Sequence, residues 1–170
     1  MIDAFQDLQN QLRKEGGAVY KPEDLEDEAA LVVRDAAFRR TVVSVYECRC
    51  AFCQLQVTSS VGQNIVDGAH IKPFSKFYDD RINNGLSLCK NHHWAFDQGW
   101  FSIDDHYRII ISNELREESP NARPMKEFQS ELILVPAQKS HVPRVEALRW
   151  HRENVFNFGD RKPLVYSDIG

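Results

Sequence analysis

The sequence predicts a small α+β domain, and three observations support that prediction. Helical patterns of apolar residues lie toward both ends of the chain, short apolar runs suited to strands lie in the middle, and two Cys/His pairs flank a loop-rich centre. A chain of 170 residues normally forms one domain and can bury a substantial core. Its 42% hydrophobic and 27% charged residues are typical of globular proteins.

Apolar residues recur at helical intervals in three segments outside the centre. The first is 1–15, which Gly16 and Gly17 end, the second is 30–46, and the third is 143–156, which begins at a proline. In the middle, the patterns predict a strand at 65–71, a polar loop at 72–84, a helix at 86–96, a hairpin of 101–103 with 107–111, and a strand at 132–135.

Charge is unevenly distributed along the chain. Residues 1–36 hold four Lys/Arg against nine Asp/Glu, whereas the remainder holds 17 against 16. We therefore predict an N-terminal helix and acidic linker arm at 1–35, the functional domain at 36–158 and an irregular tail at 159–170. The net charge of −4 argues against a protein that coats nucleic acid nonspecifically, although a near-neutral body can still bind DNA locally.

The expected location is the cytoplasm. No run approaches the ~20 apolar residues that a membrane span needs, and residues 1–5 lack the features of a signal peptide. Disulfides are uncommon in that compartment, so four cysteines indicate metal binding. A secreted, disulfide-stapled domain is the weaker alternative.

Two short-spaced ligand pairs predict a structural zinc site. Cys50-x-x-Cys53 is followed far downstream by Cys89-x-x-His92, and two such pairs supply the four soft ligands of tetrahedral zinc. Cys48 is the spare thiol; it is interpreted as a packed residue, with replacement of Cys50 as the alternative.

A second group of polar residues surrounds the same helix. It comprises His70, Asn84, His93 and Asp97. At about 100° per residue, Cys89 and His92 share one face of a helix, while His93 and Asp97 share another. One helix can therefore present a structural metal on one side and a catalytic metal on the other.

Three separated motifs carry a resemblance to a known family. They are VDGAHIKP at 66–73, NGLSLC at 84–89 and HHWAFDQG at 92–99, flanked by AFRR at 37–40 and LRWHRENVF at 148–156. Together they resemble the HNH endonucleases, most of all the catalytic domains of type IV, modification-dependent restriction enzymes. The resemblance covers roughly 36–158 and implies a ββα-metal core with a zinc-stapled knuckle, flanking helices and a β-hairpin.

The resemblance also implies a mechanism for cleaving double-stranded DNA. His70 would be the general base, and Asn84 would hold the loop that orients it. His93 and Asp97 would hold one divalent ion, Mg²⁺, Mn²⁺ or Ni²⁺, beside the scissile phosphate.

One position departs from the family pattern. Many HNH enzymes place a metal ligand immediately before the base histidine, and Ala69 stands there. Asp67 is the candidate replacement, but strand alternation points it to the face opposite His70 unless a bulge at Gly68 turns it back. This departure favours the alternative function, a catalytically inactive zinc-binding module that contacts nucleic acid or protein.

Contacts to substrate and partners are the least specified by the sequence. Four basic residues near the motifs are candidates for gripping phosphates: Lys72, Lys76, Arg81 and Lys90. No base-reading element is evident, so we expect a recognition domain or partner protein, attached through the N-terminal arm. Cutting both strands would require two copies, hence a homodimer. A role in restriction or phage defence follows from the resemblance.

Overall fold

The computed structural model describes residues 2–159. In chain order its helices and strands are α1 (Ile2–Glu15), α2 (Glu28–Val45), β1 (Val66–His70), α3 (Phe74–Phe77), β2 (Gly85–Cys89), α4 (Lys90–Asp97), β3 (Phe101–Ile103), β4 (Ile109–Ile111) and α5 (Val145–Asn154). Short 3₁₀ turns lie at Pro22–Leu25, Ile82–Asn84, Met125–Phe128 and Lys139–His141. The predicted α+β class is confirmed, whereas the predicted tail falls almost wholly outside the described residues.

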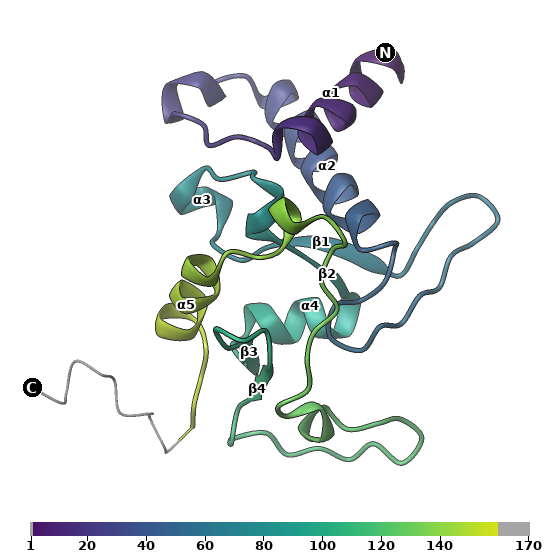
Figure 1. Ribbon diagram of the computed structural model, residues 1–170, viewed down its shortest axis with the longest axis vertical. Helices are drawn as coiled ribbons and strands as arrows, with labels where there is room; N and C mark the ends of the chain where they lie inside the picture. Colours follow the sequence, from purple (N-terminus) through teal and green to yellow (C-terminus); the bar gives the residue numbers. More distant parts are fainter. Residues whose placement is uncertain (1, 160–170) are drawn as a thin grey trace, which may run out of the picture.

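The centre of the fold is the antiparallel hairpin of β1 and β2, which lies between α2 and α4 (Figure 1). The pairing runs without a bulge from Val66 opposite Cys89 to His70 opposite Gly85. Side chains of successive strand residues point to opposite faces. His70 therefore faces α2, where its ring stacks on Phe38, and Asp67 faces α4.

Helix α2 approaches the hairpin so closely that two strand positions require glycine. A Cβ atom on Gly68 would lie 2.6 Å from the Arg39 carbonyl oxygen, and one on Gly85 would lie 2.5 Å from a methyl group of Val42. Gly68 thus serves close packing and not a bulge. Asp27 starts the helix, because its side chain accepts a hydrogen bond from the backbone N–H of Ala29 at 3.0 Å.

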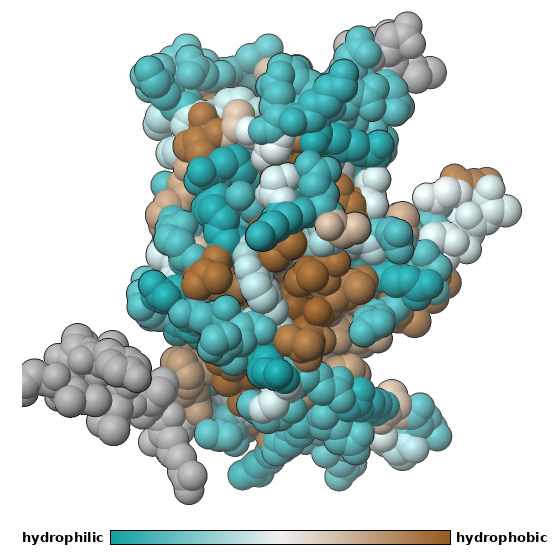
Figure 2. Space-filling view, viewed as in Figure 1, coloured by the Kyte–Doolittle hydropathy of each residue, from teal (hydrophilic) through white to brown (hydrophobic). Residues whose placement is uncertain are grey.

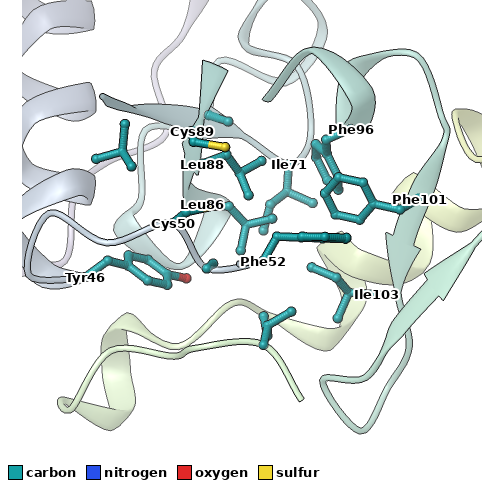
Figure 3. Packing of buried hydrophobic residues seen from close by; sticks show 14 of the residues in the cluster. Tyr46, Cys50, Phe52, Ile71, Leu86, Leu88, Cys89, Phe96, Phe101 and Ile103 are labelled. Carbon is teal, nitrogen blue, oxygen red and sulfur yellow. The ribbon is translucent and has the colours of Figure 1, made fainter. Parts of the chain in front are cut away.

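The second hairpin, β3 with β4, and helix α5 complete the core beneath α4. Phe52 of the cysteine knuckle packs against Phe101 and Phe128, with ring centroids 4.6 and 4.7 Å apart. Figure 3 shows Leu86 and Leu88 of β2 pointing into the same apolar layer as Phe96 and Phe101. On the face drawn in Figure 2, hydrophobic residues gather at this middle level and hydrophilic residues cover both ends.

Two sequence-based element predictions were wrong. Residues 86–89 form strand β2 and not the start of a helix, because β1 pairs with them and every residue of β2 is buried. Residues 132–135 form no strand. Leu132 makes an isolated bridge to Arg108, and the Ile133 N–H donates to the Tyr107 carbonyl oxygen, but no regular ladder follows. Within 2–159, no helix combines the length and the apolarity needed to cross a membrane.

The N-terminal arm packs on the rest of the chain. Helix α2 is continuous across residues 35 and 36, where the sequence suggested a domain boundary. Residues 16–20 run beside 78–82, with a bridge between Val19 and Asp79. The division into domains remains a prediction, but the arm lies against the loop that precedes β2.

Buried His151 predicts a dependence of stability on pH. Its ring stacks on Phe96 at 3.7 Å, Nε2 donates to the Phe96 carbonyl oxygen, and Nδ1 accepts from the Ser102 hydroxyl, so the ring is neutral. Burial lowers the pKa of His151 from 6.5 to about 4. Between pH 6.5 and pH 4, His151 is protonated in the unfolded chain and neutral in the folded chain. Its contribution to stability is therefore complete above pH 6.5 and is lost as the pH falls toward 4.

We expect the free energy of unfolding to lose about 2 kcal/mol at pH 5 relative to pH 7.5 through this residue. The measurement is urea denaturation of the parent and of His151→Gln at both pH values. Any effect of zinc release at low pH is common to the two proteins, so the difference between them is the contribution of His151. Equal losses in the two would contradict the assignment.

Candidate active site and metal centre

The four predicted zinc ligands come together at one point. One ligand atom from each of Cys50, Cys53, Cys89 and His92 lies within 4.8 Å of all the others. His92 Nδ1 is 3.1 Å from the Cys89 sulfur and 3.7 Å from the Cys50 sulfur. Tetrahedral zinc at its usual bond lengths separates such atoms by roughly 3.5 Å, so the donor set fits zinc.

The knuckle, the end of β2 and the first turn of α4 position these four ligands. Cys50 and Cys53 lie in a tight knuckle that ends at Gln54, whose φ of 63° is left-handed. Cys89 is the last residue of β2, and His92 lies one turn into α4, stacked on Phe52 with centroids 4.0 Å apart. Hydrogen bonds from Cys50 and Cys53 hold the pKa of the Cys89 thiol far below its usual range, and hydrogen bonds to Cys53 and Cys89 raise that of Cys50. Without metal, Cys89 is therefore the thiolate of this pair.

On the α2 side of β1, His70 is held in a fixed orientation. Its Nε2 lies 2.8 Å from a carboxylate oxygen of Asp80, and its ring stacks on Phe38 at 3.9 Å with an angle of 11° between planes. A carboxylate only accepts, so Nε2 carries the proton of the neutral ring and Nδ1 carries the lone pair. Among residues 2–159, Nδ1 has no hydrogen-bonding partner, and it is the nitrogen that can take a proton.

Asn84 is buried and ties two loops together. Its Nδ2 donates to the carbonyl oxygens of Lys72 and Asp79, at 3.1 and 3.0 Å, and its Oδ1 accepts from the Lys72 backbone N–H at 3.0 Å. These bonds fix the chain that leaves β1 against the loop that carries Asp80. Asn84 therefore has the geometry of a positioning residue.

On the α4 side, Asp67, His93 and Asp97 form a row. His93 Nδ1 lies 3.4 Å from Asp67, and its Nε2 lies 3.5 Å from Asp97. Asp67 thus reaches His93 without a bulge, because α4 covers the face to which it points. The two carboxylates contact opposite ring nitrogens, so a rotation of His93 or Asp97 would be needed for all three to converge on one ion.

The two carboxylates of this row differ in their surroundings. Burial alone would raise the pKa of Asp67, but hydrogen bonds from Lys90 and His93 hold it below its usual value. Partial burial raises the pKa of Asp97 despite the nearby His93 and Arg39. Oxygen, nitrogen and oxygen donors at one surface are the set that Mg²⁺, Mn²⁺ or Ni²⁺ accepts.

The α2 and α4 sides meet at the outer edge of β1. Arg39 of α2 donates to the Gly68 carbonyl oxygen at 2.6 Å and is near Asp97 of α4. The candidate base and the candidate metal ligands therefore lie on opposite faces of β1, and Arg39 reaches the outer edge of the strand between them.

Three of the four basic candidates already contact carboxylates. Lys72 binds Glu146 at 2.7 Å, Arg81 binds Asp79 at 2.8 Å, and Lys90 pairs with Asp67. Lys76 is exposed on α3 and has no ion-pair partner within the part of the chain that the structure describes. A phosphate would have to compete with these carboxylates, except at Lys76.

The comparisons with known proteins agree with this arrangement. Residues 50–104 match the family model of the HNH endonucleases, and this segment contains the zinc cluster, β1, β2 and α4. The matched segment lies at the centre of the chain and spans less than half of its length. Over these residues the match confirms the recognition of an HNH endonuclease that was made from the three motifs.

A solved structure shares the fold. It is a "Modification dependent TagI restriction endonuclease", similar with a TM-score of 0.54 and 24% sequence identity over 79% of this chain. This chain covers 45% of that structure, so it spans less than half of the length of that protein. No curated protein sequence matched the chain.

Sequence reasoning missed Asp80 and Arg34. The Asp79-Asp80 pair inside a loop gave only a weak signal, because adjacent acidic residues are common on surfaces. Arg34 lay in the segment interpreted as a linker arm, 46 residues from the carboxylate that it binds.

The zinc centre gives a prediction with an internal control. Cys89→Ser should lose the bound zinc and most of the thermal stability, because the cluster joins the knuckle to β2 and α4. Cys48→Ser should keep one zinc ion per chain, since Cys48 lies outside the cluster. Metal analysis and thermal unfolding check both variants; zinc loss in Cys48→Ser would mean that the ligand set is wrong.

Proposed function

We propose that the HNH domain is a metal-dependent endonuclease that hydrolyses phosphodiester bonds of double-stranded DNA, with His70 as general base. The observation that carries the proposal is an oriented His70 on one face of β1 and the Asp67–His93–Asp97 row on its other face, within the segment that matches the HNH family model. Neither group alone would indicate hydrolysis, since histidines and acidic rows are common in structural roles.

His70 meets the chemical requirements of the base. Its Nδ1 lone pair can accept a proton from a water molecule, and the Phe38 ring and Asp80 prevent the imidazole from turning away. Asn84 keeps the chain after His70 in register with the Asp80 loop. These groups hold the base in place before substrate binds, which reduces the reorganisation that the reaction requires.

His93, Asp97 and Asp67 would hold the divalent ion. When bound, such an ion neutralises charge that develops on the phosphate and stabilises the leaving oxygen. Lys90 competes with the ion for Asp67, because it pairs with the same carboxylate. Substrate phosphate arriving at the site can draw Lys90 away and leave Asp67 to the ion.

A groove beside the row gives the DNA a path to the site. It has a volume of about 850 Å³ and lies between α2, the outer part of β1 and the loop that precedes it. Its lining includes Arg39, Arg40, Asn64, Asp67 and Gly68. The loop protrudes from the body in Figure 1, and Val61 near its tip is 79% exposed. Arg39, which donates to the Gly68 carbonyl oxygen beside the row, is suited to contact a phosphate backbone.

We further propose a role in restriction or phage defence, as the resemblance to modification-dependent enzymes suggests. The TagI neighbour is described as modification-dependent and is more than twice as long as the matched part, which supports a separate recognition module acting with this HNH domain. A homodimer that cuts both strands, and a cytoplasmic location, belong to the same proposal.

The purified 170-residue chain should nick supercoiled plasmid in the presence of Mg²⁺, Mn²⁺ or Ni²⁺ and remain inactive in EDTA. His70→Ala should lower the rate by roughly 10²–10⁴-fold, the usual contribution of a general base, with zinc content and far-UV circular dichroism unchanged. Plasmids with and without modified bases are compared on agarose gels.

Each outcome separates the competing functions. Cleavage of modified plasmid alone supports restriction of modified DNA, and cleavage of both supports a nuclease whose targeting comes from elsewhere. Equal activity of parent and His70→Ala would remove His70 from the mechanism. No cleavage under any ion, with zinc intact, would favour the inactive zinc-binding module.

Asp67 should determine the concentration of divalent ion that cleavage requires. Asp67→Asn removes a charged ligand from the row, so the Mn²⁺ concentration for half-maximal cleavage should rise, by roughly 10–100-fold. Lys90→Ala is the matched control, because it breaks the same ion pair but leaves the carboxylate free for the ion. If both variants require as much Mn²⁺ as the parent, Asp67 does not bind the ion.

A further inference from the structure

Asp80 is a buried carboxylate whose two oxygens bind two different side chains. Oδ1 accepts from His70 Nε2 at 2.8 Å, and Oδ2 binds the Arg34 guanidinium. Only 1% of the Asp80 side chain is exposed. A carboxylate removed from water to this extent is stable only when it is paired and hydrogen-bonded. The positive charge of Arg34 therefore explains how Asp80 can be buried beside the His70 ring.

Arg34 is fixed by its surroundings and not only by the ion pair. Its guanidinium carbon lies 3.5 Å above the centre of the Phe74 ring, and 11% of the side chain is exposed. Phe74 in turn packs near His70, with centroids 5.7 Å apart. Arg34, Phe74 and Phe38 therefore enclose the Asp80–His70 pair on the α2 side of β1.

The N-terminal arm fixes the backbone of Asp80. The Asp80 N–H donates to the Ala18 carbonyl oxygen at 2.9 Å, and the Ile82 N–H donates to that of Gly16 at 2.8 Å. Between them, Gly17 has a φ of +87°, and a Cβ atom there would lie 2.2 Å from the Asp80 carbonyl oxygen. The arm is thus in direct contact with the loop that carries the carboxylate.

We propose that Asp80 is the positioning residue of His70 and that Arg34 and residues 16–20 of the arm hold Asp80 in place. This inference rests on the proposed role of His70 as base. The bond to Asp80 keeps the proton on Nε2, so the lone pair stays on Nδ1, away from the carboxylate. On this view the arm that the sequence assigned to a linker is part of the catalytic unit.

The substitution Asp80→Asn tests the proposal, because the structure dictates how the new amide would turn. Arg34 can only donate, so the amide oxygen must face Arg34 and the amide NH₂ must face Nε2. Nε2 then becomes an acceptor, and the ring proton moves to Nδ1. We expect ¹⁵N NMR of the zinc-loaded protein to show the Nε2–H form of neutral His70 in the parent and the Nδ1–H form in Asp80→Asn.

Cleavage of plasmid by Asp80→Asn should fall by at least roughly 10²-fold, since the base nitrogen is then protonated. Asp79→Asn is the matched control: it removes the neighbouring buried carboxylate, which binds Arg81 and Arg144, and it should leave the His70 tautomer unchanged. A parent ring in the Nδ1–H form, or the same tautomer in the parent and Asp80→Asn, would overturn the proposal.

Two glycines supply a second test that leaves the charged pair intact. Gly16 and Gly17 both have positive φ, so alanine strains the backbone at either position, but only a Cβ on Gly17 meets the Asp80 loop. Gly17→Ala should slow cleavage at least 10-fold more than Gly16→Ala, at equal zinc content. Equal rates would show that the arm does not support the pair. Full activity of His70→Ala would instead show that His70 is not the base. The His70 tautomer in the parent and in Asp80→Asn would still show whether Asp80 fixes the position of the ring proton.

Discussion

The close packing of α2 against the β1–β2 hairpin is the constraint on which the rest of this fold depends. Gly68 lets the helix backbone at Arg39 approach the strand, and Gly85 makes room for the Val42 side chain, so a side chain at either position would push the two layers apart. That contact encloses His70 between Phe38 and the loop of Asp80. With α4 on the other face, the hairpin carries a different set of polar residues on each side.

The Cys50–Cys53–Cys89–His92 cluster joins segments that have little regular structure of their own. Cys50 and Cys53 belong to a knuckle whose backbone joins the outer edge of β2 through the bond from the Ala51 N–H to the Ser87 carbonyl oxygen. A metal held by this cluster would, together with that bond, fix where β2 ends and α4 begins, and hence where His93 points. The proposed structural zinc and the proposed catalytic ion would then share one short helix, because His92 and His93 lie on different faces of α4.

The sequence was sufficient where ligand chemistry depends on short spacing and insufficient where it depends on the packing of distant segments. Cys50, Cys53, Cys89 and His92 could be predicted because two short pairs of soft ligands have few other uses. Strand β2 was misread because Leu86 and Leu88 suit a helix as well as a strand until β1 is known to pair with them. Asp80 could not be predicted, because its partners His70 and Arg34 meet it only after the arm and α2 are in place.

The division of groups between the two faces of β1 limits where a phosphate can bind. Its outer edge pairs with no strand among the described residues, and Arg39 donates there to the Gly68 carbonyl oxygen beside Asp97. Because the proposed base lies on one face and the proposed metal ligands on the other, they could act on the same phosphate only across this edge. The edge also borders the groove that Arg40 and Asn64 line. The proposed mechanism therefore requires the outer edge of β1 to stay unpaired, because another strand bonded there would cover the path between His70 and His93.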